Sequence, residues 1–549
     1  MPGLKPRPTR RKQEKVGRVI SSLRAPIFLA AGLAAVSTLV APLLAARQPA
    51  LTGSARLARV YDAILDARID DVPRLLDETC GPRPSSAPGR PRRHEAERAP
   101  QEACQLLDVL SIWWQMQLDA ESLTHDARFA ARVDAAIADI EAWTQQEPDK
   151  AEAWFYLGGA YGARAQWQAL RGERLAAARE GKRIKQALER ALELDETLHD
   201  AYFGIGLYHY YADVAPTTAK MLRWLLALPG GDKEEGLRQM LRARQSGELL
   251  QDEADYQLHL IYLWYEKQPD RALTLLKGLA QAHPRNPLFA AQAADVEDAY
   301  LSDYGASLAS WRALYDAARA HRVAEPEASE VRARIGMAKQ LDALHETDLA
   351  IDHLRTVVAA RPAAPFESYA LAELRLGQGL DRMGQRSEAV AAYRRALDAV
   401  PSRDPLNVEA GARAGLRKAP DADTALAYRL SIEGARATER GDLTTAARVL
   451  ARSLALRPDN QVTRYRQARL LDARNDDLAA IELYESVMSA GETTPPTVFA
   501  TASLHAARLY ERQRDQARAI DLYERAQTAF GVDLTTKAAA ARALARLTK

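Results

Sequence analysis

The sequence has only two cysteines in 549 residues, and glycine and proline are scarce, with 29 and 27 copies. So few cysteines exclude a disulfide-rich scaffold, and so little glycine and proline excludes a collagen or a low-complexity polymer. Hydrophobic residues make up 47% of the chain and charged residues 27%. This composition is typical of a folded, helix-rich protein made of several domains or of one long repeat array.

The sequence also lacks the motifs of common enzymes and metal sites. We find no P-loop, no Gly-x-Ser-x-Gly turn, no His-Glu-x-x-His and no paired-cysteine metal motif. Gly204 and Gly206 do not form a nucleotide-binding fingerprint, because no strand precedes them and the third glycine is missing. We therefore expect no catalytic residue, no metal and no cofactor, and an enzyme is the least favoured class of function.

The charge is unevenly distributed along the chain. Residues 1–24 carry eight Lys and Arg against one acidic residue, whereas residues 25–549 carry 67 Lys and Arg against 72 Asp and Glu. A nucleic-acid partner normally requires a basic surface that neutralises phosphates. The slightly acidic body therefore argues against nucleic-acid binding.

A hydrophobic segment follows the basic tail of residues 1–24. Residues 25–46 contain no charged residue and span about 33 Å as a helix, enough for a hydrocarbon core of about 30 Å. We expect a single-pass anchor in the inner membrane, with the tail in the cytoplasm and the chain from residue 47 on the periplasmic side. A cleaved signal, which would export the protein, and an ordinary buried helix are the alternatives.

The two cysteines flank a proline-rich stretch. Cys80 and Cys104 lie on either side of residues 81–100, which must form a loop because proline interrupts helices. A disulfide between them would contribute roughly 3 to 4 kcal/mol and would form in an extracytoplasmic compartment. Two unrelated thiols are the alternative. Residues 47–101 are thus expected to hold short helices and this loop.

Beyond residue 100 the pattern is helical, with apolar residues at steps of three and four. A recurrent set has alanine, two further residues four and seven positions later, and a proline five after that, as in Ala389, Tyr393, Ala396 and Pro401. Such a set describes one amphipathic helix and its end. A small residue often precedes the alanine by twelve positions, which allows two antiparallel helices to approach closely. Equivalent sets begin at Ala136, Ala272, Ala350 and Ala446.

These patterns resemble the tetratricopeptide repeat (TPR) family, in its bacterial membrane-anchored or exported type. The first helix of the family motif is best matched by Trp154, Leu157, Gly158 and Tyr161, and the second by the set at Ala389. The resemblance implies an all-α, right-handed superhelical solenoid of helix-turn-helix repeats that binds proteins or peptides on its concave surface.

The repeats fall into blocks. We expect a main solenoid over residues 102–401, a linker over 402–424 rich in turn-forming residues, and a C-terminal TPR block over 425–549.

One hairpin, between Tyr161 and Ala191, is longer than the family motif. Both of its helices are expected to extend by two turns. They would then present basic residues to anionic lipid head groups or to an acidic partner, or simply to solvent. These residues are Arg171, Arg174, Lys182, Arg183 and Lys185.

A second departure is an inserted apolar segment, residues 215–228, which ends before a new helix capped by Asp232 and Glu235. It is too apolar for an exposed element. It either fills the concave groove as a structural helix, contributes to a peptide-binding site there, or lies on the membrane surface.

The residues expected to line the groove are mostly aromatic. The resemblance places first-helix side chains on the concave surface, where Tyr and Trp would anchor a bound peptide. The leading hypothesis is a non-catalytic scaffold that binds a protein or peptide partner. The alternative is an envelope protein that binds an apolar ligand such as lipid, with the inserted helix as a lid. The groove residues are Phe155, Phe203, Leu207, Tyr210, Tyr211, Trp264 and Tyr265.

Overall fold

The computed structural model describes residues 50–81, 98–215, 230–529, 532 and 534–548. They belong to a compact unit that contains Ala50–Lys549, and a second unit, Leu4–Pro49, lies outside the described residues. The predicted tail, the predicted anchor at 25–46, most of the proline-rich loop and nearly all of the inserted segment 215–228 also lie outside them. None of the described helices combines the length and apolarity that a membrane crossing requires.

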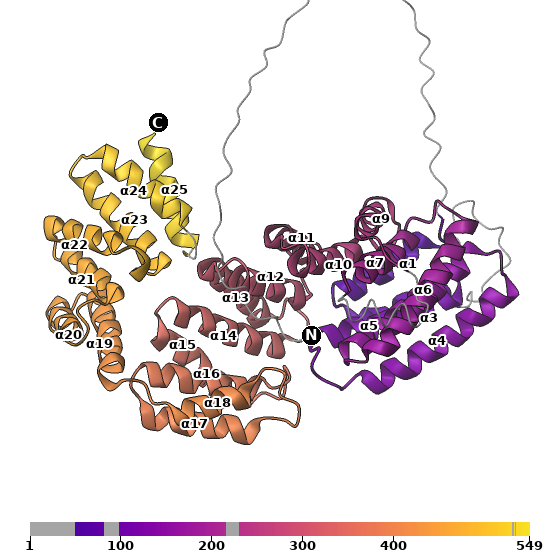
Figure 1. The fold of residues 1–549 in the computed structure, drawn as a ribbon, viewed down its shortest axis with the longest axis horizontal. Helices are drawn as coiled ribbons and strands as arrows, with labels where there is room; N and C mark the ends of the chain where they lie inside the picture. The colour runs from indigo at the N-terminus through magenta and orange to yellow at the C-terminus, as the bar shows by residue number, and fades with distance from the viewer. Residues whose placement is uncertain (1–49, 82–97, 216–229, 530–531, 533, 549) are drawn as a thin grey trace, which may run out of the picture. The chain divides into compact units, whose positions relative to one another are not determined.

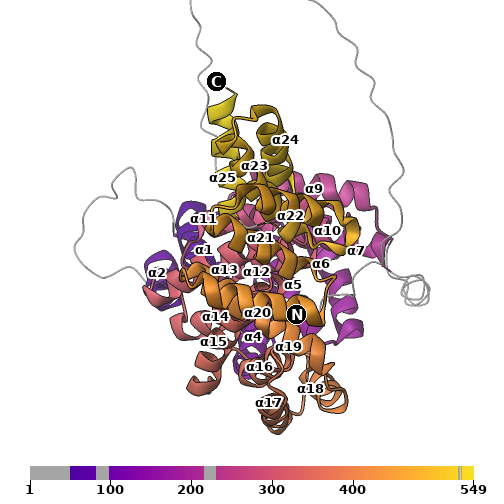
Figure 2. The same cartoon turned by 90° about the vertical axis from the view of Figure 1, so that its left-hand side faces the viewer.

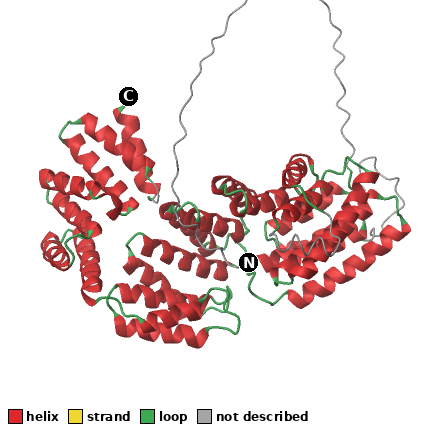
Figure 3. Ribbon diagram, in the orientation of Figure 1, coloured by secondary structure: helices red, strands yellow, loops and turns green. Residues whose placement is uncertain are grey.

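The described residues form helices and contain no strand, so the all-α prediction is confirmed (Figure 3). Short helices come first: α1 (Ser54–Leu65), the 3-10 turn η1 (Ile69–Asp71) and α2 (Val72–Cys80). The next group is α3 (Gln101–Leu118), α4 (Asp126–Gln146), α5 (Ala151–Leu170), α6 (Arg174–Leu194), α7 (Ala201–Val214), α9 (Lys233–Ser246), α10 (Gln251–Trp264), α11 (Pro269–Ala282) and α12 (Pro287–Ala299).

The second half continues the same alternation of helix and short turn (Figures 1 and 2). It comprises α13 (Tyr304–Arg319), α14 (Pro326–Ala343), α15 (Thr347–Ala360), α16 (Ser368–Arg382), α17 (Arg386–Ala399), α18 (Val408–Arg417), α19 (Ala422–Glu439), α20 (Leu443–Leu456), α21 (Gln461–Ala473), α22 (Asp477–Ser489), η2 (Gly491–Thr493), α23 (Pro496–Arg512), α24 (Gln516–Thr528) and α25 (Leu534–Leu547).

Consecutive helices pack as TPR-like hairpins, as the sequence predicts. The alanines that begin the recurrent sets, among them Ala272, Ala389 and Ala446, are fully buried. A Cβ atom on Gly377 would lie only 2.6 Å from Cε1 of Tyr393, so the glycine allows α16 and α17 to touch. The chain is therefore an array of TPR-like hairpins, while the right-handed superhelix stays a prediction.

Two local predictions about helix ends are also confirmed. The long hairpin consists of α5 and α6, with 20 and 21 residues. The inserted segment is followed by α9, where the Asp232 carboxylate accepts hydrogen bonds from the backbone N–H groups of Glu234 and Glu235 at 2.9 and 3.0 Å. A carboxylate at this position satisfies donors that the first turn of a helix leaves free.

The predicted linker 402–424 is not only a linker, because it contains the ten-residue helix α18. Val408 and Ala412, four residues apart, are fully buried on one face of α18. A Cβ on Gly415 would lie 2.4 Å from Cζ of Tyr393, so α18 packs closely on α17. Helix α18 was not predicted from the sequence, because turn-forming residues flank it and only two of its residues, Val408 and Ala412, are buried apolar ones.

The N-terminal helices are built into the array of repeats. The Asn286 side-chain amide donates a 2.7 Å hydrogen bond to the carbonyl of Leu65 at the end of α1. The Arg285 backbone N–H donates to Asp66 at 2.9 Å. The structure also joins Cys80 of α2 to Cys104 of α3 by a disulfide, with the two Cα atoms 6.3 Å apart. Helices α1 and α2 are therefore fixed to α3 and to the start of α12.

Candidate functional site

A cavity of about 650 Å³ lies among α3, α5, α6 and α7. Its wall is mainly apolar, with Leu106, Leu107 and Leu110 from α3 and Phe203 and Leu207 from α7. Cavities of roughly 300–1,000 Å³ with mostly apolar walls are typical of small-molecule sites. The cavity is therefore the leading candidate for a binding site in the described part of the chain.

Small residues on α5 and α6 create the space. Gly158 serves close packing, because a Cβ there would meet Leu188 at 2.5 Å. Gly162, one turn later on α5, has no atom within 4 Å of the position its Cβ would take, although it lines the cavity. Ala163, Ala177 and other alanines continue the lining. The α5–α6 hairpin thus borders a cavity because the glycine and alanine residues along this part of the wall have too little side-chain volume to fill the space.

One end of the cavity is buried and polar. The Tyr61 hydroxyl donates a 2.7 Å hydrogen bond to Glu253, and the amide of Gln257 donates to the same carboxylate at 3.4 Å. Burial raises the pKa of Glu253, and the hydrogen bonds from Tyr61 and Gln257 oppose that rise. The hydroxyl of Tyr156, also buried, has no hydrogen-bond partner among the described residues.

Asp200 is the second carboxylate at this end of the cavity. It accepts hydrogen bonds from the backbone N–H groups of Glu248, Leu249 and Leu250 at 2.7, 3.0 and 2.7 Å. Burial raises the pKa of Asp200, and these three backbone donors oppose the rise. The Asp200 carboxylate thus stabilises the turn before α10, and these three bonds leave it little capacity to accept hydrogen bonds from a ligand.

The other end of the cavity is exposed and basic. Arg174, Leu175 and Ala178, in the first turns of α6, line the cavity and are exposed to solvent. No ion-pair partner of Arg174 is found within the described chain. Three of the other predicted basic residues differ: Arg171 pairs with Asp126 at 2.5 Å, Arg183 with Glu180 at 3.4 Å, and Lys185 with Glu189.

The structure divides the predicted groove residues among three places. Phe155, Phe203, Leu207 and Tyr211 line the cavity. Tyr210, Tyr211 and Tyr265 form a tyrosine trio, with ring centroids 5.7 to 5.8 Å apart in edge-to-face pairs. Trp264 packs elsewhere, in a small cluster with Leu263. The structure therefore brings four of the seven residues to one cavity and sets Trp264 apart, because neighbouring side chains on one helix point to different surroundings. Their role in binding a partner stays a prediction.

The tyrosine trio has a buried and an exposed side. Tyr210 is fully buried and its hydroxyl donates a 2.6 Å hydrogen bond to Glu266. Tyr265 is 37% exposed, one of the few large apolar side chains that reach solvent. In the trio, the exposed ring of Tyr265 thus packs on Tyr210, which burial and its hydrogen bond to Glu266 hold in place.

No local pattern in the sequence indicates that α1 and α3 reach the cavity. Tyr61 closes its buried end, and Leu106 and Leu110 of α3 form part of its wall. The apolar spacing in residues 54–65 identifies a helix, but nothing local identifies its partner at α10. The proposed lid, residues 215–228, lies outside the described residues except for Ala215, which lines the cavity.

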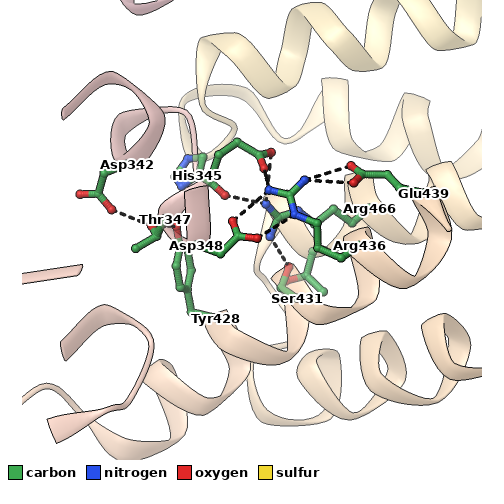
Figure 4. Close-up of polar contacts among 11 residues, drawn as sticks. Asp342, His345, Thr347, Asp348, Tyr428, Ser431, Arg436, Glu439 and Arg466 are labelled. Atoms are coloured by element: carbon green, nitrogen blue, oxygen red, sulfur yellow. Dashed lines mark hydrogen bonds and ion pairs between the residues drawn. The ribbon is translucent and has the colours of Figure 1, made fainter. Parts of the chain in front are cut away.

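Away from the cavity, a polar network joins α19 and α21 to the turn between α14 and α15 (Figure 4). The Arg436 guanidinium donates two hydrogen bonds to Asp348, at 2.7 and 2.9 Å, and also contacts Glu346. Arg466 is buried and donates to the carbonyl of His345 at 2.7 Å. This network ties the predicted C-terminal block to the main solenoid across more than one repeat.

No cluster of three or more His, Cys, Asp or Glu side chains in the described ranges is arranged to hold a metal ion. His259, one of the histidines on separate helical units, is fully enclosed, and burial lowers its pKa to about 3. A neutral, buried imidazole of this kind is a packing residue.

No protein-family model matches the chain, and no curated protein matches it. Among solved structures, similarity is found to a tetratricopeptide repeat protein from Parabacteroides merdae, at 15% identity over 54% of this chain and 99% of that one, with a TM-score of 0.25. A Rap protein complexed with competence and sporulation factor is 13% identical over 91% and 100%, with a TM-score of 0.30.

Yeast Tom70 is 13% identical over 79% of this chain and 96% of that one, with a TM-score of 0.24. TM-scores this low mean that the whole chains do not superpose. The assignment of TPR-like repeats therefore rests on the hairpins described above.

Proposed function

We propose that this protein is a non-catalytic scaffold of TPR-like repeats that binds a protein or peptide partner through an aromatic surface centred on the tyrosine trio. The observation that carries the proposal is the exposed edge of Tyr265 on the buried, hydrogen-bonded base of Tyr210. Tyrosine is enriched at binding hot spots, because it combines a large rigid ring with a hydroxyl. The arrangement suits an anchor that is already ordered before binding.

A photo-crosslinking experiment tests the scaffold proposal. The photoreactive amino acid p-benzoylphenylalanine replaces Tyr265 in the full chain, in cells, and at the exposed residue Arg448 of α20 as a matched control. We expect discrete protein adducts from position 265 and none from position 448. The same adduct pattern at both positions, or no protein adduct at 265, would contradict the proposal.

The topology proposed with this function is a single-pass anchor at residues 25–46, with the repeats on the periplasmic side of the inner membrane. The basic tail of residues 1–24 supports this orientation, since positive charge stays in the cytoplasm. The Cys80–Cys104 disulfide supports it too, because disulfides persist in oxidising compartments.

Thiol labelling tests the orientation. Cells are lysed in acid to trap thiols, and a maleimide-linked polymer is added before and after reduction. We expect labelling of the wild-type chain only after reduction, and no labelling of a Cys80→Ala/Cys104→Ala variant under either condition. Labelling before reduction would place the repeats in a reducing compartment.

The cavity favours a second candidate function, the binding of an apolar ligand. Its walls are mostly leucine, alanine, glycine and aromatic side chains, and its size suits a small molecule rather than a protein surface. This function is compatible with a scaffold, because the trio shares only Tyr211 with the cavity wall.

A further inference from the structure

The wall of the cavity suits one unbranched apolar chain. Its buried end lies at Tyr61 and Glu253, and its exposed end at Leu175 and Ala178. Between them the wall is formed largely by glycine and alanine on α5 and α6, with Gly162 facing open space. A ligand that enters at the start of α6 can thus extend along α5 and α6 toward Tyr61 of α1.

The polar groups of the cavity are poorly suited to a peptide. A buried peptide brings an N–H and a C=O at every residue, and each must find a hydrogen-bond partner. Here the hydroxyl of Tyr61 is engaged by Glu253, and Asp200 is engaged by three backbone N–H groups. The Tyr156 hydroxyl and the Gln166 side-chain amide remain, and they can satisfy only a few polar atoms. A chain of methylene groups requires no such partners.

Charge is graded along the cavity. Asp200 and Glu253 lie at the buried end, and Arg174 lies at the exposed end. Lys182 lies one turn of α6 after Ala178, next to the wall residue Gly181 but outside the cavity wall itself. It is exposed, and like Arg174 it has no ion-pair partner in the part of the chain that the structure describes. An anionic group would be repelled from the buried end and attracted to the exposed end.

We propose that the cavity binds a single-chain anionic lipid, with its acyl chain between α5, α6 and α3 and its anionic head group at Arg174 and Lys182. This inference rests on the second candidate function, apolar-ligand binding. It specifies the ligand by three properties: one apolar chain, one anionic end, and that end at the mouth formed by the start of α6.

Photolabelling of the full chain in its membrane tests the proposal. The probe is a sixteen-carbon fatty acid with a diazirine in its chain, and labelled peptides are mapped by mass spectrometry. We expect adducts on peptides from α3, α5 and α6. The Gly162→Leu variant fills the cavity, since a Cβ there meets nothing, and we expect labelling to fall at least ten-fold.

Gly278→Leu is the matched control for Gly162→Leu. Gly278 lies on α11, outside the cavity, and its Cβ would also meet no atom within 4 Å. We expect wild-type labelling from this variant. Equal labelling of the Gly162→Leu and Gly278→Leu proteins, with both folded by circular dichroism, would overturn the proposal.

A second pair of measurements tests the head-group site without changing the cavity wall volume. In an Arg174→Gln/Lys182→Gln variant we expect labelling by the acid probe to fall about 25-fold, since each basic residue near an anionic group contributes about a five-fold preference. Labelling by the corresponding uncharged alcohol probe should be unchanged. Arg448→Gln, on α20, is the control for charge loss. An equal fall with both probes would contradict the assignment of the head-group site.

Competition separates the sources of the ligand. If unlabelled palmitate displaces the probe more effectively than lysophosphatidylglycerol does, the ligand is a free fatty acid. If lysophosphatidylglycerol is the more effective competitor, the ligand is a lysophospholipid. Either result supports the proposal. Displacement by neither, or cavity adducts that consist of protein instead of lipid, would overturn it. Loss of protein adducts at Tyr265 bears on the scaffold proposal alone, because that position is not part of the cavity wall.

Discussion

Tyr61 and Glu253, which are 192 residues apart in the sequence, are joined by a 2.7 Å hydrogen bond in which the tyrosine hydroxyl donates to the carboxylate. Both side chains are buried. Through this contact α1 closes the inner end of the cavity and is held against α10. A buried carboxylate that loses a donor retains its desolvation cost, so the bond matters for stability.

Replacing Tyr61 by phenylalanine should therefore lower the free energy of unfolding by about 1–3 kcal/mol. The loss should grow as the pH rises, because the hydrogen bond from Tyr61 stabilises the ionised form of Glu253, whose pKa is raised by burial. Denaturant unfolding followed by circular dichroism measures the change. Tyr304→Phe, at a partly buried tyrosine in the first turn of α13, is the control. Equal losses in the two variants would contradict this prediction.

Gly377 and Gly278 should respond in opposite directions to the same substitution. An alanine Cβ at Gly377 would lie 2.6 Å from Cε1 of Tyr393, whose hydroxyl is fixed by a 2.9 Å hydrogen bond to Asp381. Gly377→Ala should destabilise the protein by about 1–3 kcal/mol through overpacking. Gly278→Ala, in open space on a helix, should stabilise it by roughly 0.5–1 kcal/mol. Thermal unfolding of the two variants measures both; a shared sign would refute the packing at Gly377.

Arg436→Gln should loosen the attachment of α19 to the turn between α14 and α15. It removes two hydrogen bonds to Asp348 and the contact with Glu346, both of which are partly buried (Figure 4). We expect faster hydrogen exchange in α19 and α21 than in the wild type, and a loss of about 1–2 kcal/mol in stability. The control is Arg448→Gln on α20. Unchanged exchange in α19 would show that apolar packing alone holds the joint.

Glu367 should make the protein less stable as the pH rises. Burial and the neighbouring Asp404 carboxylate raise the pKa of Glu367 from its ordinary 4.5 to about 8. The folded state therefore keeps a proton that the unfolded state releases, so stability should fall between about pH 4.5 and pH 8. Glu367→Gln should reduce this slope, and Glu492→Gln, at an exposed position, should leave it unchanged. The measurement is the free energy of unfolding from pH 5 to pH 9. The same dependence on pH in the Glu367→Gln variant and the wild type would contradict the prediction.

The sequence predicted the repeats well because they depend on local spacing. An alanine followed by residues four and seven positions later defines one face of a helix, and a small residue twelve positions earlier marks the close approach of its partner. The long hairpin of α5 and α6 and the cap at Asp232 are likewise local features, and both are confirmed. Helix α18 was missed, because turn-forming residues surround a short apolar face.

By itself, then, the amino-acid sequence determined that this chain is an array of α-helical hairpins, because periodicity and small residues specify each hairpin within a few dozen residues. Only the tertiary structure decided where the aromatic residues point and what closes the cavity. Adjacent residues such as Tyr210 and Tyr211 differ by about 100° around their helix, so one is buried and the other reaches the cavity wall. The partner of α1 lies almost 200 residues away, at Glu253, and no local pattern encodes a contact over that separation.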